Sequence, residues 1–210
     1  MNSKSPSSRG FSSHIDATFR GTAWISLLAA VCYLTAAFTL PESLGGKNSI
    51  PEYLQLGILA IGIIFCFRAN NRKQFYTFAA LVLIFLFVRE INYGRTLPCF
   101  ADPDNPEKFK KWKEIPYGWL AHVLVGIYLA AIAAYYVWRK LWQDTWELLS
   151  KVRIPAWETA VMVAAAVCAQ LTERLIHNDF VEEFFELTFY TAFICLLWRY
   201  TAGRVQTNAE

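Results

Sequence analysis

Long apolar stretches separated by short polar segments make up most of the chain, and few of these stretches alternate as half-buried strands do. A bilayer core about 30 Å thick is crossed by roughly 20 mostly apolar residues of α-helix. Six stretches meet that requirement: residues 22–40, 51–67, 75–93, 116–138, 155–177 and 183–200. We therefore predict an all-α, polytopic membrane bundle of about six transmembrane helices.

The predicted organisation is one six-helix transmembrane domain, residues 14–204, between two cytoplasmic tails. Residues 1–13 are small and polar and are expected to be disordered, and residues 205–210 form the second tail. A signal peptide is the alternative for the first stretch, because Arg9 and Arg20 precede it. Its apolar run is longer than a signal core of ~7–15 residues, so we favour a retained helix.

Composition and charge agree with a membrane protein and give an orientation. Hydrophobic residues make up 55% of the chain, above the ~45–50% of soluble domains. With the N-terminus in the cytoplasm, more than half of the Lys and Arg residues fall on the inner side, as the positive-inside rule requires. Four lysines in one outer loop, Lys108, Lys110, Lys111 and Lys113, argue mildly against this. We predict an N-in, C-in, multi-pass protein of the bacterial inner membrane.

The outer loop, residues 96–114, contains Asn105-Pro106-Glu107-Lys108, which has the pattern of a helix cap followed by a first-turn proline. Phe109 and Trp112 would share one face of such a helix. We therefore expect a short helix that lies on the outer membrane surface.

On the inner side, Trp138, Trp142 and Trp146 recur every four residues. This spacing predicts an amphipathic, interfacial continuation of the fourth helix. The basic residues of this segment are few and mixed with acids, so we expect no nucleic-acid partner. The lipid bilayer is the partner that the pattern does predict, whereas protein partners are not indicated.

Three of the predicted helices bring charge to one depth in the outer leaflet. At 1.5 Å per residue, Arg89 and Glu90 lie roughly 20 Å from the inner interface, Glu173 and Arg174 about 27 Å, and Glu186 roughly 20 Å. A charged side chain at a helix centre costs about 2.5–3.5 kcal/mol on insertion scales, so such groups normally face inward and find partners.

Helical spacing then orients these groups. Glu173 and His177 lie one turn apart on the fifth predicted helix, and Glu183, Glu186 and Tyr190 follow one face of the sixth. The short turn between the two helices, predicted at residues 178–182, makes them antiparallel neighbours. Their polar stripes are therefore expected to face each other.

Acids outnumber bases in this region. The bases are Arg89, Arg95 and Arg174, and the acids are Glu90, Glu173, Asp179, Glu182, Glu183 and Glu186. Water can solvate the outermost acids, a buried glutamate can stay protonated, or a cation can bind. Glu173, His177, Glu183 and Glu186 form a mixed oxygen and nitrogen set that suits a divalent metal such as zinc, manganese or iron.

Two alternatives to a metal site remain open. One is a purely structural polar network. The other is a metal-free pocket in which Arg89 or Arg174, with Tyr93, holds an anionic headgroup while a carboxylate or imidazole shuttles protons. The candidate catalytic residues are Glu173, His177, Glu186 and Glu90.

Two short motifs carry a resemblance. Arg89-Glu90-Ile91-Asn92-Tyr93-Gly94-Arg95 resembles the E-E-I-S-W-G-Q-R stretch of some uncharacterised bacterial multispanning inner-membrane proteins. Leu175-Ile176-His177-Asn178 is similar to an N-L-H-N element of the same proteins. The resemblance implies that Glu90 and His177 belong to one site, and it implies no activity.

Taken together, these patterns favour an inner-membrane protein with a polar Glu/His/Arg site near the outer leaflet, acting as an enzyme on a lipid or lipid-linked substrate. A small transporter or channel subunit that moves protons or a cation is one alternative, and a structural or assembly protein is another. The five cysteines form no C-x-x-C pair, which argues against a thiol oxidoreductase.

Overall fold

The fold is taken from a computed structural model, and the description covers residues 15–41, 50–69, 72–91, 101–102, 105–109, 114–115, 117–151, 154–176 and 178–201. Within these residues the chain is mostly helical, as predicted. The long helices are α1 (Gly21–Thr39), α2 (Ile50–Arg68), α3 (Lys73–Glu90), α4 (Trp119–Trp138), α6 (Ala156–Leu171) and α7 (Asp179–Thr201). Each of the six predicted stretches therefore forms a helix. The tails at residues 1–13 and 205–210 lie outside the described residues.

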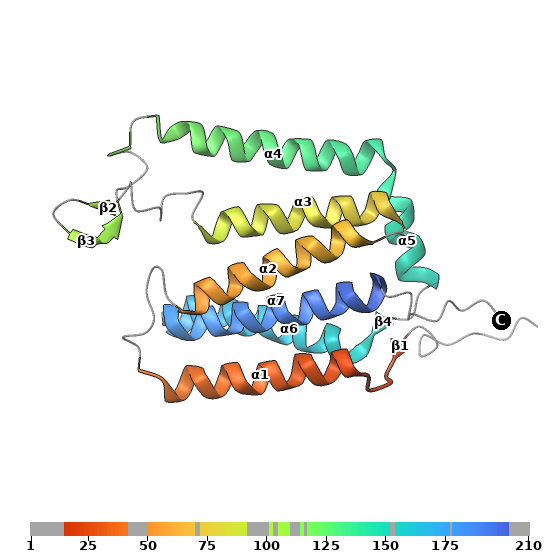
Figure 1. The fold of residues 1–210 in the computed structure, drawn as a ribbon, viewed down its shortest axis with the longest axis horizontal. Helices are drawn as coiled ribbons and strands as arrows, with labels where there is room; N and C mark the ends of the chain where they lie inside the picture. Colours follow the sequence, from red (N-terminus) through yellow and green to blue (C-terminus); the bar gives the residue numbers. More distant parts are fainter. Residues whose placement is uncertain are drawn as a thin grey trace, which may run out of the picture.

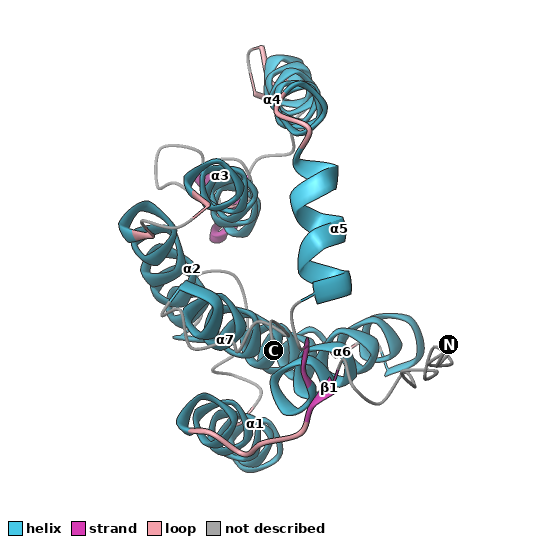
Figure 2. Cartoon of the chain, turned by 90° about the vertical axis from the view of Figure 1, so that its right-hand side faces the viewer, coloured by secondary structure: helices cyan, strands magenta, loops and turns pink. Residues whose placement is uncertain are grey.

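The long helices lie side by side, with α7 near the centre of the bundle (Figures 1 and 2). Helix α7 packs against α6, α1 and α2, and α2 also packs against α3. Helix α4 lies at the periphery, where Ile132 is its one buried residue. We name the two ends of the bundle by the elements beside them: the hairpin end, near strands β2 (Ala101–Asp102) and β3 (Asn105–Phe109), and the α5 end, near α5 (Leu141–Lys151).

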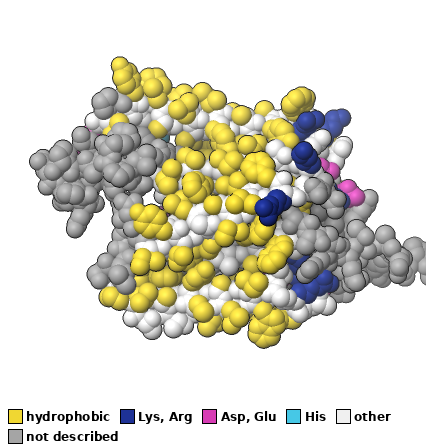
Figure 3. Space-filling view, viewed as in Figure 1, with side chains coloured by type: hydrophobic (Ala, Val, Ile, Leu, Met, Phe, Trp, Pro, Cys, Tyr) yellow, Lys and Arg dark blue, Asp and Glu magenta, His cyan; other side chains and the backbone are white. Residues whose placement is uncertain are grey.

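Helices α1, α2 and α4 are long and apolar enough to cross a membrane. Large apolar side chains such as Leu28, Leu124 and Ile127 are exposed on these helices, and apolar side chains cover much of the face in Figure 3. A soluble protein rarely exposes an apolar surface of this extent, so the fold supports membrane association.

The core lies where α2, α3 and α7 meet. Leu59 and Leu83 are fully buried there, and Ile194 packs with them. Gly62 allows the close approach, because a Cβ at this position would overlap Ile194 Cδ1 and lie 3.2 Å from Leu83 Cδ1. This contact fixes the depth of α2, α3 and α7 relative to one another.

The tryptophan stripe at the α5 end belongs to two helices, so the predicted continuation of α4 is wrong. Lys140 has φ 53° between α4 and α5, and this left-handed conformation ends the first helix. Trp138 therefore belongs to α4, whereas Trp142 and Trp146 belong to α5. All three indoles are exposed, and Leu141 anchors α5 in the interior.

The predicted surface helix at the hairpin end is also wrong. Asn105–Phe109 is strand β3, which pairs antiparallel with β2 through Ala101↔Phe109 and Asp102↔Asn105. A residue that precedes proline is pushed toward extended backbone. Pro106 therefore favours a strand at Asn105, and this preference outweighs the capping pattern.

The connection between the last two long helices differs from the predicted turn at residues 178–182. Helix α6 continues as a π-helical turn, η6 (Thr172–Ile176), and α7 already begins at Asp179. The side chain of Asn178 caps α7, since the backbone N–H of Val181 donates to Asn178 Oδ1 at 3.1 Å. The acids that follow fall in the first turns of α7, where the helix dipole favours negative charge.

Candidate functional site

Four of the polar side chains singled out in the sequence meet at the hairpin end, and we call them the Arg89 cluster: Arg89 and Glu90 on α3, and Glu186 and Tyr190 on α7. Arg89 donates from Nη2 to Glu186 Oε1 at 2.6 Å, and its Nε lies 3.5 Å from Glu90 Oε1. The Tyr190 hydroxyl donates to Glu90 Oε1 at 2.7 Å. Arg89 therefore pairs with Glu90 and Glu186, two of the acids that the residue count along the helices places at its depth.

Core packing explains why these groups meet. Leu83 and Ile194 pack at the same depth beside Gly62. Glu90 lies two turns beyond Leu83, or about 10 Å, whereas Tyr190 lies one turn beyond Ile194 in the same direction, or about 6 Å. The length of the tyrosine side chain bridges the difference in depth, so its hydroxyl reaches the carboxylate.

The Arg89 cluster is open on one side and carries an excess of acid. The Arg89 side chain has an exposed fraction of 45%, whereas that of Glu90 is 9%, and Tyr190 is buried. Two carboxylates surround one guanidinium, so the ionised cluster carries net negative charge. Such a site accepts a proton or a cationic group more readily than an anion.

The other candidates on the last two helices are not part of the Arg89 cluster. Glu173 and Arg174 lie in η6 and are exposed, and Gln170 donates to Glu173 at 3.3 Å. Arg174 has no ion-pair partner among the described residues. Glu186 and Tyr190 of the α7 stripe contact α3, whereas the expected facing of Glu183 and His177 stays a prediction.

His177 and Tyr93 lie outside the described residues, so their predicted roles stay predictions. Glu183 is described, and its backbone carbonyl accepts a hydrogen bond from Gln55 at 3.0 Å. Within the described part of the chain, no three His, Cys, Asp or Glu side chains lie close enough to hold a metal ion. The predicted metal set of Glu173, His177, Glu183 and Glu186 includes the undescribed imidazole and also stays a prediction.

A second network, which the sequence reasoning missed, lies at the α5 end. We call it the Arg199 network: Arg199, Glu158, Asp16 and Thr22. Arg199 donates to both carboxylate oxygens of Glu158 at 2.8 and 3.0 Å, and to Asp16 at 2.6 Å. The Thr22 hydroxyl donates to Glu158 at 2.5 Å. The network joins α1, α6 and α7 to the segment before α1.

The segment before α1 is hydrogen-bonded to the start of α6. Strand β1 (Ile15–Asp16) pairs in parallel with β4 (Ile154–Pro155), and Trp157 Nε1 donates to the carbonyl of Ala17 at 3.0 Å. Partial burial raises the pKa of Asp16. The hydrogen bonds from Thr18 and the charges of Arg199 and Arg20 outweigh that effect, so the pKa of Asp16 lies below its ordinary value.

Hairpin geometry was the signal that could have revealed the Arg199 network. In two antiparallel helices, residues equally far from the connecting turn lie at the same depth. Glu158 and Arg199 are equally far from Asn178 to within one residue. Taken alone, Glu158 at a helix start is explained by compensation of the helix dipole, and Arg199 is explained by the positive-inside rule.

Comparison of the chain with protein-family models, with curated proteins and with solved structures found no match.

Proposed function

We propose that the chain is a six-span, N-in/C-in protein of a bacterial inner membrane, with the hairpin end at the outer side. The six long helices lie alongside one another, and large apolar side chains are exposed on α1, α2, α4 and α6. Among the described residues, Lys and Arg gather at the α5 end of the face in Figure 3, which suits the cytoplasmic side. The bases at the α5 ends of α2, α3 and α4 are Arg68, Arg72, Lys73, Arg139 and Lys140.

The contrast between the two charged networks carries the functional proposal. In the Arg199 network, the side chains of Arg199 and Glu158 have exposed fractions of 2% and 0%. This arrangement suits a lock between helices, because the paired guanidinium and carboxylate of Arg199 and Glu158 are both shielded from water. Arg89 is nearly half exposed, so the ion pairs that it makes with Glu90 and Glu186 are open on one side. An open charged cluster within the membrane suits chemistry better than structural support.

We infer that the protein acts on a lipid or lipid-linked substrate in the outer leaflet by proton transfer. Glu186 and Glu90 are the proposed acid and base, each held by a hydrogen bond from Arg89 or Tyr190. Because two carboxylates occupy Arg89, Arg174 is the better candidate to hold an anionic headgroup.

Glu173 and His177 remain proposed acid and base groups on the neighbouring helix. Glu173 follows Thr172 in η6, and π-helical turns are frequent at functional sites. A lipid headgroup at the outer interface would reach an exposed carboxylate at this position without a path through the bundle. This part of the proposal extends the site from α7 to η6.

Transport is less well supported, because an apolar core separates the two networks. Leu59, Leu83 and Ile194 pack between α2, α3 and α7, at a depth between the Arg89 cluster and the Arg199 network. A proton or cation path along this interface would need polar groups or water at that depth. The tight contact at Gly62 leaves no room for a water chain there.

The test compares the lipids of cells that express the wild type, Glu186→Gln or the matched control Glu182→Gln, which changes an acid on the same helix outside the Arg89 cluster. We expect wild type and Glu182→Gln to change the amount of one lipid class relative to the empty vector. Glu186→Gln should insert normally and leave that class unchanged. Identical lipid profiles for the folded wild type and the empty vector would overturn the proposal.

A further inference from the structure

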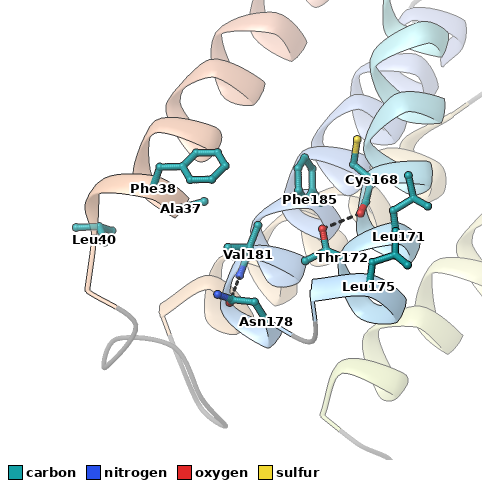
Figure 4. A pocket seen from close by; sticks show the side chains of 10 residues that line it. All are labelled: Ala37, Phe38, Leu40, Cys168, Leu171, Thr172, Leu175, Asn178, Val181 and Phe185. Carbon is teal, nitrogen blue, oxygen red and sulfur yellow. Dashed lines mark hydrogen bonds between the residues drawn. The ribbon is translucent and has the colours of Figure 1, made fainter.

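A separate pocket lies at the hairpin end between α1, the η6 turn and α7 (Figure 4). Its volume is about 560 Å³, within the ~300–1,000 Å³ that is usual for small-molecule sites. Phe38 of α1 and Phe185 of α7 contribute to its walls, with Leu171 and Leu175 from the end of α6 and from η6. The residues of the Arg89 cluster do not line it.

The described residues that line the pocket offer little for a polar ligand to bind. Thr172 Oγ1 donates to the carbonyl of Cys168 at 2.9 Å. Asn178 Oδ1 accepts from the backbone N–H of Val181 at 3.1 Å, so it already serves as the cap of α7. With these polar groups satisfied inside the protein, apolar contact is the main source of affinity that the lining can supply.

The pocket opens onto the surface that the bilayer covers. Phe38 and Leu175 at its edge have exposed fractions of 76% and 74%. Phe38 belongs to α1, which is a candidate span, and the exposed Leu28 and Val31 continue the same apolar surface along that helix. An apolar chain in the membrane can therefore enter sideways without crossing a polar layer.

The shape of the lining favours an elongated occupant. From Cys168 to Leu175, the pocket follows the end of α6 and the η6 turn for about 10 Å along the helix axis. The lining residues of this helix end recur at three- and four-residue spacing from Cys168 to Leu175, so they share one face. A flat aromatic ligand would not use this length.

We propose that this pocket is a specific binding site for one acyl chain of a membrane lipid. The site holds the chain between α1 and the α6–α7 hairpin, and it differs from the general lipid annulus because both walls are protein. This inference goes beyond the proposed function, since binding here requires none of the Arg89 cluster.

The test uses palmitate that carries a diazirine in its chain, incorporated at low abundance into phospholipid vesicles that contain the full-length protein. After illumination, mass spectrometry locates the labelled residues. We expect labelling of Leu171, Leu175 or Phe185 to saturate and to fall when unlabelled palmitate is added. Labelling of the lipid-exposed Leu124 should rise in proportion to the probe, without saturation.

Filling the pocket gives the matched comparison. Val181→Phe, in the lining, should reduce pocket labelling by about fivefold or more, whereas Val163→Phe, on the exposed face of α6, should not. If Val181→Phe does not fold, Leu171→Trp on the half-exposed wall carries the same test. Unsaturable pocket labelling at the level of Leu124 would overturn the proposal. The readout involves no turnover, so it stands apart from the test of the proposed function.

Discussion

Arg199 donates two hydrogen bonds to the Glu158 carboxylate, at 2.8 and 3.0 Å, and both side chains are buried. The two residues are far apart in sequence, and the α6–α7 hairpin brings them together. Removing one partner of a buried pair leaves an uncompensated charge, whereas replacing both with apolar residues of similar volume is often neutral. The Arg199 network therefore makes a specific prediction about single and double variants.

Arg199→Met should lower the free energy of unfolding by about 3–5 kcal/mol, because Glu158 then stays buried without its cation. The double variant Arg199→Met with Glu158→Met should recover most of that loss. Reversible unfolding in mixed micelles measures both values. Additive losses in the double variant would show that the two side chains are not coupled.

The lowered pKa of Asp16 leads us to expect that the stability of the protein depends on pH. Its pKa in the folded protein lies below its ordinary value, so folding favours the carboxylate. The resulting stabilisation is present above the unfolded pKa of about 3.9 and is lost as the pH falls through the lower, folded pKa. Asp16→Asn should thus lower the melting temperature at neutral pH and have little effect in strong acid. Asp144→Asn on α5 is the control, and an equal, pH-independent loss from Asp16→Asn would contradict this account.

Gly62 and Gly57 form a matched pair on α2. A Cβ at Gly62 would overlap Ile194, whereas a Cβ at Gly57 meets nothing within 4 Å. Gly62→Ala should destabilise the bundle by about 1–3 kcal/mol through overpacking. Gly57→Ala should be neutral, or stabilising by up to ~1 kcal/mol from helix propensity. Thermal unfolding of the two variants measures both effects, and equal shifts in melting temperature would contradict the packing described at Gly62.

Much of the helical architecture could be predicted from the sequence, because a helix that crosses a bilayer needs a long apolar run. Depth was also predictable: counting residues along the helices placed Arg89, Glu90 and Glu186 at one level, and the structure brings them together. The direction in which each polar stripe faces could not be predicted. Periodicity shows which residues share a helix face, but it does not show which neighbour that face meets.

Local signals failed where two of them competed. At Asn105 the capping pattern favoured a helix, but the restriction before Pro106 favoured extended backbone, and the structure has a strand. At residues 178–182 the acids read as a solvated turn, whereas the Asn178 cap makes them part of α7. At Asn105 a backbone preference outweighed a capping pattern, whereas at Asn178 a side-chain cap outweighed the polarity of the residues that follow.

Tyr190 should matter more to stability than an ordinary hydrogen-bonding tyrosine. Its hydroxyl donates to the Glu90 carboxylate at 2.7 Å, whereas the Tyr128 hydroxyl donates to the carbonyl of Leu81 at 2.9 Å. Tyr190→Phe should cost about 1.5–3 kcal/mol and Tyr128→Phe about 0.5–1.5 kcal/mol, because bonds to charged groups are stronger. Similar losses in chemical unfolding would indicate that Glu90 is not ionised in the folded protein.

The central claim is that the closed Arg199 network locks the bundle, while the open Arg89 cluster is available for chemistry. The most direct measurement is the free energy of unfolding of Glu158→Gln and Glu186→Gln under identical conditions. We predict a loss of about 3–5 kcal/mol for Glu158→Gln, because the buried Arg199 loses the carboxylate that accepts two of its hydrogen bonds and keeps only Asp16. For Glu186→Gln we predict less than about 1 kcal/mol, because its arginine is half exposed. Equal, large losses would show that both networks are structural locks and would contradict the account.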